Sequence, residues 1–372
     1  MAKVSVQHLQ LVYAGSATND GGIDLEIADR ELVVIAGPRG CGKSSLLRAI
    51  AGLEHISKGE VFISDRRVTN LAPKERDIAI IFETAALYPR MSIHANLAFG
   101  LRRRKFSEKE AKKRIDGTAE TLGITELLDR QPHELTAIQG QLVAIARAAV
   151  RQPKVVLFDE PLLGFDVALR SRMRAVIMRL REHLQATFIY ATRDPGDAMA
   201  LADRIALMRD GVIQQLAASA EIYDLPHNLF VAGFLGAPGM NFVNGTLRLD
   251  REGFVFSESE GGTIQLPLLR SQGSELQEFV GKPIILGIRR EDIRVSEATT
   301  ERREAVAEFP AIIDLVEPGG AETNLYIHTG AHALICRTSE RFEEGEVRHR
   351  ARFAFNRERV HLFDPATTLR IA

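Results

Sequence analysis

The fold of this 372-residue chain is indicated by residues 37–44, which read Gly37-Pro38-Arg39-Gly40-Cys41-Gly42-Lys43-Ser44. The run fits the pattern G-x-x-x-x-G-K-S/T, in which glycines let the backbone wrap around a phosphate chain without Cβ clashes. Backbone N–H groups and the N-terminus of a following helix supply positive potential there. We expect Lys43 to reach the two outer phosphates of a nucleotide and the Ser44 hydroxyl to bind Mg²⁺.

The segments on either side of this loop are those that a phosphate-binding loop requires. Residues 32–36 form a continuous apolar run, typical of a strand buried on both faces, and a helical stretch follows at 44–53. Helical character is also expected over about 88–150. Further short apolar runs lie at 78–82, 155–158 and 187–190. Strands alternating with helices predict a mostly parallel α/β sheet.

An acidic pair follows one of these runs. Asp159 and Glu160 come directly after residues 155–158, so both carboxylates are expected at the carboxyl end of a buried strand. We expect Asp159 to hold Mg²⁺ through water and Glu160 to polarise the water that attacks the terminal phosphate. Capping of the next turn is the common alternative for such a pair, but the upstream phosphate loop favours the catalytic role. The two motifs together predict a site for ATP and Mg²⁺.

Composition narrows the class of protein. With 45% hydrophobic and 26% charged residues the chain is expected to pack well, and its length suggests two domains. The net charge of −1 gives no general attraction to nucleic acid or to an anionic membrane, and we interpret the basic run 102–105 as a solvated surface. The two cysteines exclude a disulfide framework. Neither an export signal nor a membrane-spanning apolar stretch is found, so any membrane role would need a partner.

The pattern of the chain changes near residues 233–241, which are rich in Gly, Ala and Pro. Beyond them, short alternating segments recur at regular intervals, as expected of a small β-barrel or sandwich. These segments are 245–249, 253–257, 263–266, 283–288, 312–316, 324–327, 333–337 and 351–355. We therefore predict an α/β nucleotide-binding domain at 1–237, with its helical part at about 88–150, and an all-β domain at 238–372.

Longer stretches resemble one family, the ATP-binding subunits of ABC importers of the carbohydrate type, over essentially the whole chain. The matching text includes ALYPRMSI at 86–93, AFGL at 98–101, VAIARA at 143–148, FDEPL at 158–162, DAM at 197–199, ADR at 202–204 and NLFVAGF at 228–234. Segments 287–293, 316–322 and 361–364 resemble the oligonucleotide-fold regulatory domain of these importers. Such an ordered series of matches is specific.

The resemblance implies an ATPase that energises uptake of a small carbohydrate or polyol, as a peripheral subunit on the cytoplasmic face of the cell membrane. It implies two membrane-spanning permease subunits, contacted through residues 84–93, and a solute-binding protein reached only indirectly. It also implies a dimer of nucleotide domains, in which each ATP lies between one subunit's phosphate loop and the other's signature motif. No nucleic acid partner is expected.

Site residues follow from the motifs and the resemblance together. The catalytic set is Lys43, Glu83, Glu160 and Arg193, and the metal-binding set is Ser44, Glu83 and Asp159. The nucleotide-binding set is Tyr13, expected to stack on adenine, then Gly37, Pro38, Arg39, Gly40, Cys41, Gly42, Lys43, Ser44, Ser45, Leu135, Thr136, Ala137, Ile138, Gln139, Asp159 and Asp166. An ordinary strand position is the alternative role for the tyrosine.

Four positions depart from the family's pattern. The signature L-S-G-G-Q is here LTAIQ at 135–139, and the β-branched Ile138 should obstruct the approach of backbone N–H groups to the γ-phosphate. Glu83 replaces the family's glutamine; it can still bind Mg²⁺ but adds negative charge. Arg193 replaces the switch histidine and cannot release a proton. Loop 163–166 lacks the usual serine.

These departures suggest reduced selection for fast hydrolysis. They favour pairing with a different, intact ATPase subunit over a homodimer, because the defects are then divided between two composite sites. A second hypothesis is a catalytically weak ATP-binding pseudo-enzyme that gates a transporter. A third, a soluble ABC ATPase acting on DNA or ribosomes, is disfavoured by segment 84–93, the C-terminal β domain and the neutral charge. Sugar, polyol and glycerol phosphate all stay open as the transported compound.

Overall fold

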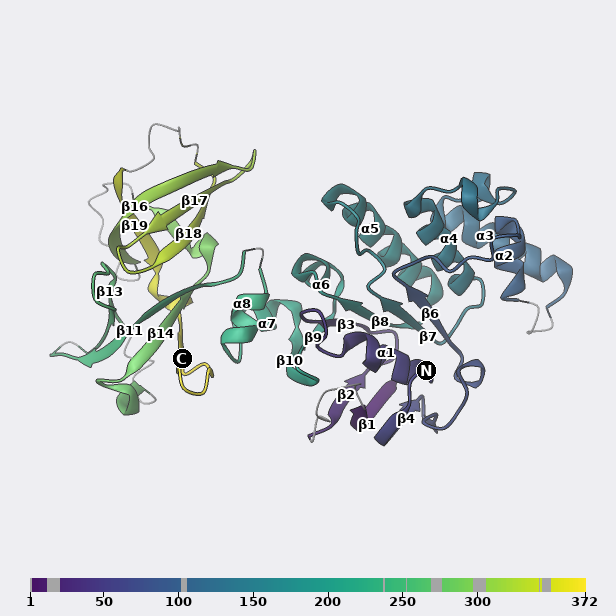
Figure 1. Ribbon diagram of the computed structural model, residues 1–372, viewed down its shortest axis with the longest axis horizontal. Coiled ribbons are helices and arrows are strands. Elements are labelled where there is room, and N and C mark those ends of the chain that lie inside the picture. Colours follow the sequence, from purple (N-terminus) through teal and green to yellow (C-terminus); the bar gives the residue numbers. More distant parts are fainter. Residues whose placement is uncertain are drawn as a thin grey trace. The chain divides into compact units, whose positions relative to one another are not determined.

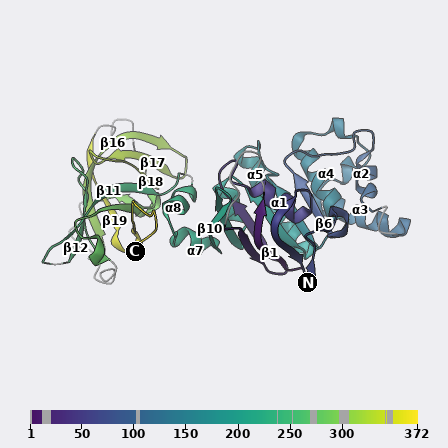
Figure 2. The same ribbon diagram turned by 60° about the horizontal axis from the view of Figure 1, so that its bottom comes forward.

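The computed structural model describes residues 2–11, 21–101, 106–236, 238–251, 253–268, 276–296, 306–340, 342 and 349–372. Contacts divide the chain into two compact units, Met1–Ile222 and Tyr223–Ala372. Figure 1 labels helices and strands of each unit where there is room, and Figure 2 shows the units after a turn of 60°. A functional boundary after residue 237 stays a prediction.

A six-stranded sheet forms the centre of the first unit, in the order β10-β9-β3-β8-β7-β6. Its strands are β3 (Leu32–Ala36), β6 (Ile78–Phe82), β7 (Val155–Asp159), β8 (Thr187–Thr192), β9 (Arg204–Arg209) and β10 (Val212–Ala218). All pair in parallel except β10, which is antiparallel to β9. Every residue of β3, β7 and β8 is buried, as expected of strands inside a parallel sheet. The predicted, mostly parallel α/β sheet is confirmed.

A second, antiparallel sheet has the order β2-β1-β4-β5. Its strands are β1 (Val4–Leu11), β2 (Ile23–Ile27), β4 (Ile56–Ile63) and β5 (Arg66–Arg67). Helix α1 (Lys43–Ala51) shares one hydrophobic core with both sheets: Leu46 and Ile50 of the helix belong to the same cluster as Val6 of β1 and Val33 of β3. This core fixes the helix that follows the phosphate loop.

The stretch expected to be helical forms three packed α-helices with short 3₁₀ turns between them. These are α2 (Ile93–Phe99), α3 (Glu108–Leu122) and α4 (Ala137–Ala149), with turns η3 (Thr125–Leu127) and η4 (Pro132–Glu134). Ser92, Ser107 and Thr136 begin the helices, each accepting a backbone N–H bond of the first turn on its side-chain oxygen. In the described part of the chain, no helix combines the length and the apolar character needed to cross a bilayer.

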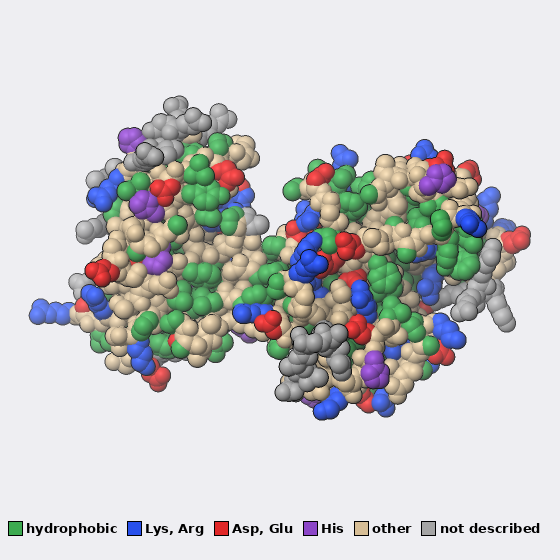
Figure 3. Space-filling model, in the orientation of Figure 1, with side chains coloured by type: hydrophobic (Ala, Val, Ile, Leu, Met, Phe, Trp, Pro, Cys, Tyr) green, Lys and Arg blue, Asp and Glu red, His purple; other side chains and the backbone are tan. Residues whose placement is uncertain are grey.

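Charged side chains gather over helices α5 (Val167–Leu184) and α6 (Pro195–Leu201), as Figure 3 shows. Arg170 of α5 pairs with Asp194, the residue that begins α6. One turn further along α5, Arg174 lies 3.3 Å from the carboxylate of Asp197. Burial, together with the nearby Asp194 carboxylate, raises the pKa of Asp197 to about 6. Two ion pairs therefore hold these helices together.

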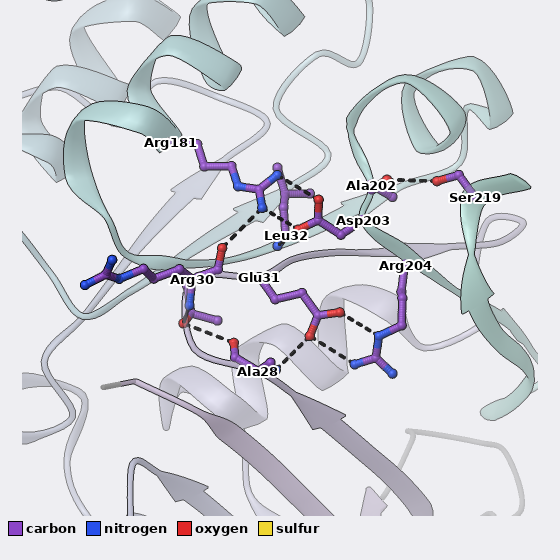
Figure 4. A network of polar contacts seen from close by, with 10 residues as sticks. Ala28, Arg30, Glu31, Leu32, Arg181, Ala202, Asp203, Arg204 and Ser219 are labelled. Carbon is purple, nitrogen blue, oxygen red and sulfur yellow. Dashed lines mark hydrogen bonds and ion pairs between the residues drawn. The ribbon is translucent and has the colours of Figure 1, made fainter.

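Further ion pairs fasten the amino ends of the central strands (Figure 4). Arg181 of α5 donates to both carboxylate oxygens of Asp203, and to the Arg30 carbonyl at 3.2 Å. Arg204, the first residue of β9, pairs with Glu31 at 2.5 and 3.0 Å. These contacts fix the end of the sheet opposite to the phosphate loop. The carboxyl ends, where ligands bind in open α/β sheets, stay free of this network.

Two five-stranded antiparallel sheets build the second unit, in the orders β13-β12-β11-β14-β20 and β15-β19-β16-β17-β18. Their strands are β11 (Asn241–Leu249), β12 (Phe254–Glu258), β13 (Gln265–Pro267), β14 (Pro283–Ile288), β15 (Ile293–Val295), β16 (Val306–Pro318), β17 (Thr323–His328), β18 (Ala333–Thr338), β19 (Arg350–Asn356) and β20 (His361–Phe363). Inward-facing residues of both sheets form one core. The predicted all-β fold of this region is confirmed.

Short helices complete the two units. They are α7 (Ser219–Asp224), α8 (Leu229–Phe234), η1 (Pro73–Glu75), η6 (Gln277–Phe279), η7 (Arg290–Asp292) and η9 (Arg357–Arg359). Arg289, which directly follows β14, contacts the carboxyl end of α8. Its guanidinium donates to the carbonyls of Ala232 at 3.0 Å and Leu235 at 2.7 Å. That buried side chain thereby satisfies carbonyl groups at the end of the helix.

A buried polar cluster links the two sheets of the second unit. The side chain of Glu258 is fully buried. Its carboxylate accepts hydrogen bonds from the Thr329 hydroxyl and from Ile264 N–H at 2.9 Å. His332 Nδ1 lies 2.7 Å from the same carboxylate, and His332 Nε2 accepts the Asn244 N–H at 3.0 Å. Because Nε2 is the acceptor, the ring proton belongs on Nδ1, where it is donated to Glu258.

Replacing Glu258 by Gln should destabilise this unit by about 3 kcal/mol, because an amide cannot accept from all of these buried donors. The matched control is Glu308→Gln, which removes a half-exposed carboxylate lying 3.6 Å from Arg352. That change should cost less than about 1 kcal/mol. Urea unfolding of the full chain measures both variants. Equal midpoints for the two would show that the buried cluster contributes nothing particular to stability.

Candidate functional site

The loop 37–44 connects the carboxyl end of β3 to the start of α1. Gly40 and Gly42 have φ angles of 81° and 104°, in the left-handed region that favours glycine. The backbone N–H groups of Gly40, Gly42 and Lys43 have no acceptor among the described residues. Unpaired N–H groups in such a turn, at a helix N-terminus, form an anion-binding cradle. The loop therefore fits a phosphate chain.

Lys43 supplies a buried positive charge beneath this cradle. Its side chain is only 3% exposed. The ammonium donates to the carbonyls of Gly37 at 2.9 Å and Pro38 at 2.8 Å. It also lies 3.5 Å from Glu160 Oε1. A buried ammonium is tolerated because its donors are used in this way. Burial raises the pKa of the neighbouring Cys41 thiol, so this cysteine stays protonated.

Asp159 ends β7 beside the loop. Its Oδ1 accepts the Ser44 hydroxyl at 2.6 Å, and its Oδ2 lies 3.6 Å from Arg48 Nη2. A hydroxyl and a carboxylate in contact are oxygen ligands of the kind that Mg²⁺ prefers, so this pair fits a magnesium ion. Arg48 was not predicted. It lies four residues after Ser44, on the same face of α1, and that spacing could have suggested it.

Glu160 occupies a strained position next to these groups. Its φ angle is 49°, a left-handed backbone that costs a non-glycine residue about 1 kcal/mol. Its N–H donates to the Ala191 carbonyl of β8 at 3.1 Å. Oε2 lies 3.6 Å from Arg193 Nε, so the carboxylate stands between two cations, Lys43 and Arg193. In this position Glu160 can orient a water molecule and accept its proton.

These groups share one cleft of about 750 Å³. Ten of its lining residues are members of the predicted sets: Arg39, Gly40, Gly42, Lys43, Ser44, Ser45, Glu83, Asp159, Glu160 and Arg193. Arg48, Phe82, Thr84 and Leu163 also line it and were not predicted. Four basic and three acidic side chains surround the cleft. This excess of positive charge favours a polyanionic ligand.

Other predicted residues lie elsewhere. Residues 135–139 do not line this cleft and form the start of α4, where Thr136 Oγ accepts the Gln139 N–H at 3.3 Å and Gln139 Oε1 accepts the Thr136 N–H at 3.0 Å. Such a reciprocal pair is a capping box. Asp166 caps α5 through its Oδ1. Tyr13 lies outside the described residues.

Two side chains of α4 tie the helical part to the segment around Glu83. Gln141 donates from Nε2 to the Phe82 carbonyl at 2.9 Å, and is buried. Arg147 donates from Nη1 to the Ala86 carbonyl at 2.6 Å. Neither residue was predicted, because both bonds reach backbone groups about 60 residues earlier in the chain. They link α4, through one residue of its second turn and one of its last turn, to the segment around Glu83, which lines the cleft.

The chain is similar to proteins of known family along its whole length. A family model described as ABC transporter matches residues 21–163, and one described as MalK OB fold domain matches residues 236–293. The oligosaccharides import ATP-binding protein MsmX of Bacillus subtilis is 40% identical over 374 residues, covering 100% of both chains. The trehalose/maltose import ATP-binding protein MalK of Thermococcus litoralis is 41% identical over 364 residues, covering 95% of both.

Two further comparisons agree with these. The sulfoquinovosyl glycerol transport ATP-binding protein SmoE of Agrobacterium fabrum is 41% identical over 367 residues, covering 99% of both chains. Among solved structures, cbiO1 from Clostridium perfringens, part of the ABC transporter complex cbiONQ, superposes with a TM-score of 0.55 at 28% identity. That match covers 59% of the present chain and 90% of cbiO1.

Proposed function

This chain belongs to the ABC transporter ATPases of the carbohydrate-import type, and we propose that it binds and hydrolyses ATP to energise import of a small carbohydrate or polyol. The observation that carries the proposal is the cleft in which Lys43, Asp159 and Glu160 meet below a phosphate cradle. Identity of 40% over the full length to an oligosaccharide-import ATP-binding protein supports the substrate class.

In this proposal the loop 37–44 binds the phosphates of ATP through its backbone N–H groups. Lys43 turns from the loop carbonyls to the two outer phosphates. Tyr13 stacks on the adenine. When bound, Mg²⁺ neutralises charge on the phosphates. Ser44, Asp159 and Glu83 offer oxygen atoms to hold it, and the first two already touch through a hydrogen bond of 2.6 Å.

Glu160 and Arg193 act on the attacking water. Glu160 accepts a proton from that water as it approaches the terminal phosphate. Arg193 stays charged throughout and lies beside Glu160, so it compensates negative charge without taking part in proton transfer. No observation favours the weak pseudo-enzyme considered from the sequence; the cleft holds Lys43, Glu160 and Arg193, the residues to which we assign hydrolysis.

A second ATPase subunit completes each site. Residues 135–139 would face the partner's phosphate loop, with the Thr136 hydroxyl able to leave its capping bond for the terminal phosphate. Ile138 places a branched side chain where close approach is needed, so a partner with an unaltered signature would serve this chain's cleft better than a second copy. We therefore favour a heterodimer. Residues 238–372 would act as the regulatory domain of the subunit.

We propose that the permease docks in a second groove of about 920 Å³. Leu53, Tyr88 and Phe99 line it with exposed apolar surface, and the rings of the last two lie 4.6 Å apart. Gathered apolar side chains of this kind mark a protein contact. Segment 84–93, expected to meet the permease, supplies Tyr88 to the groove. Docking there would keep the chain on the cytoplasmic face of the membrane as a peripheral subunit.

Purification of the tagged chain from detergent-solubilised membranes should recover permease subunits with several membrane spans. Tyr88→Asp should reduce their recovery about tenfold, because it places a charge in an apolar contact. The control is Val212→Asp: Val212 is 41% exposed and Tyr88 40%, but Val212 lies outside the groove. A second, different ATPase in the same preparation would support the heterodimer.

Three results would count against these proposals. Wild-type chain that recovers no membrane-spanning partner would remove the basis for a transport role. Equal loss of partners in the Tyr88 and Val212 variants would leave transport intact but move the docking site away from the groove. Recovery of this chain as the sole ATPase would overturn the heterodimer alone.

A further inference from the structure

Arg170 lies at the start of α5 and contacts two loops that flank the cleft. Its Nε donates to the Phe165 carbonyl at 3.0 Å, and its Nη1 pairs with Oδ2 of Asp194. Phe165 belongs to the segment that runs from Glu160 to α5, and Asp194 belongs to the turn between β8 and α6. The planar guanidinium offers fixed donors to both at once, which a lysine could not do.

Asp194 is held in one orientation by its other contacts. Its Oδ1 accepts the Asp197 N–H at 2.8 Å, which begins α6, and its own N–H donates to the Thr192 hydroxyl at 3.0 Å. Only Oδ2 is left for Arg170. The backbone of Arg193, one residue before Asp194, is therefore fixed between the end of β8 and the ion pair.

These contacts form a closed ring of interactions, which runs from Arg193 through Glu160, Phe165, Arg170 and Asp194 back to Arg193. Arg193 Nε lies 3.6 Å from Glu160 Oε2. From Glu160 the chain continues into a tight turn, in which the Leu163 N–H donates to the Glu160 carbonyl at 3.2 Å, and reaches Phe165. Arg170 joins Phe165 back to Asp194, the neighbour of Arg193. Arg193 and Glu160 are thus joined twice, directly by their side chains and indirectly through Phe165, Arg170 and Asp194.

We propose that Arg170 is a positioning residue, which holds Arg193 against Glu160 by joining the turn after Glu160 to Asp194. The inference rests on the proposed function, because it assumes that nucleotide is hydrolysed in this cleft. Arg170 does not line the cleft, so its effect is exerted through Arg193. It is not needed to cap α5, since Asp166 already does so.

The neighbouring Arg174 provides a matched control. Its side chain is 24% exposed and that of Arg170 is 21% exposed, and each pairs with an aspartate of the α6 region. Arg174 pairs with Asp197, inside α6, and has no contact with the segment from Glu160 to Asp166 among the described residues. Loss of either arginine removes one α5–α6 ion pair, but only loss of Arg170 opens the ring.

The test uses the full-length chain in its copurified complex, with four single variants, Arg170→Met, Arg170→Lys, Asp194→Asn and Arg174→Met, and one double variant. Asparagine keeps the Oδ1 that caps α6 and removes the charge facing Arg170. Arg170→Met and Asp194→Asn should each lower kcat about tenfold or more, as expected when a group at the reacting centre is misplaced. KM for MgATP and Kd for a non-hydrolysable ATP analogue should stay within about twofold, because the phosphate cradle is untouched.

Three comparisons decide the outcome. The double variant Arg170→Met/Asp194→Asn should be no slower than the slower single variant, since both changes open the same ring. Arg170→Lys should recover little of the rate, because an ammonium cannot bridge both loops. Arg174→Met should lower the melting temperature and leave kcat within about twofold.

The inference is overturned if Arg170→Met keeps the wild-type kcat, or if Arg174→Met lowers kcat as strongly, since Arg170 would then serve only stability. Multiplicative losses in the double variant also overturn it. If Arg170→Met does not fold, Arg170→Lys and Asp194→Asn carry the same test. Failure of the wild-type chain to bind the analogue would instead be a failure of the proposed function.

Discussion

Glu160→Gln should lower the rate of phosphate release by at least about 100-fold while ATP stays bound. Glutamine has the size of glutamate but cannot accept a proton from the attacking water at neutral pH. Its neutral amide also no longer engages Lys43 and Arg193, the cations that lie 3.5 and 3.6 Å from the carboxylate. Both become available to the triphosphate, so affinity for ATP should be unchanged or higher.

Phosphate release and retained nucleotide should be measured on the same full-length preparation. Glu182→Gln is the control, because it neutralises an exposed carboxylate of α5 far along the helix from its start. It should leave both quantities as in the wild type. A Glu160→Gln variant that hydrolyses ATP at the wild-type rate would remove Glu160 from the catalytic role, whatever the affinity.

Lys43→Ala should weaken binding of MgATP by at least about 100-fold, since it deletes charge-assisted hydrogen bonds to the phosphates. The same change leaves the Gly37 and Pro38 carbonyls without their donor and Glu160 without one of its cations. The loop should then lose order as well as charge, so catalysis and binding should fail together. This pattern differs from that of Glu160→Gln, in which binding persists.

Equilibrium binding of a fluorescent ATP analogue, with melting temperature recorded alongside, measures this effect. Lys112→Ala on the exposed face of α3 is the control and should bind as the wild type does. If Lys43→Ala binds the nucleotide within about tenfold of the wild type, then the cradle alone carries the affinity. In that case the buried ammonium would have a structural role in the loop.

The motifs that could be predicted from the sequence are those whose residues are adjacent in the chain. The phosphate loop and the pair Asp159-Glu160 are contiguous, and each follows a short apolar run that forms a fully buried strand. The short strands of the second unit were recognisable because apolar residues recur at every second position of the sequence. In β17 these alternate positions are the buried ones. The local sequence pattern was therefore enough to predict functional residues that directly follow a recognisable strand.

Contacts between distant segments could not be predicted in this way. Arg170 reaches Asp194 across 24 residues and Gln141 reaches Phe82 across 59, and nothing in the local pattern of either donor names its acceptor. The antiparallel sheet around β1 was also missed as a separate layer, because β4 follows α1 after only a few residues and reads as mixed polar sequence. These features depend on how the elements pack, which single-sequence periodicity does not encode.

The left-handed backbone at Glu160 has a consequence for the history of this chain. Glycine would relieve that conformation, so selection for folding alone should replace the glutamate readily. Residues 135–139 stand at an ordinary helix start and can drift without such pressure. A lineage that had abandoned hydrolysis would be expected to lose its glutamate first and its signature afterwards. This chain keeps the glutamate in its strained conformation beside an altered signature, which is the combination expected when the Glu160 carboxylate is needed.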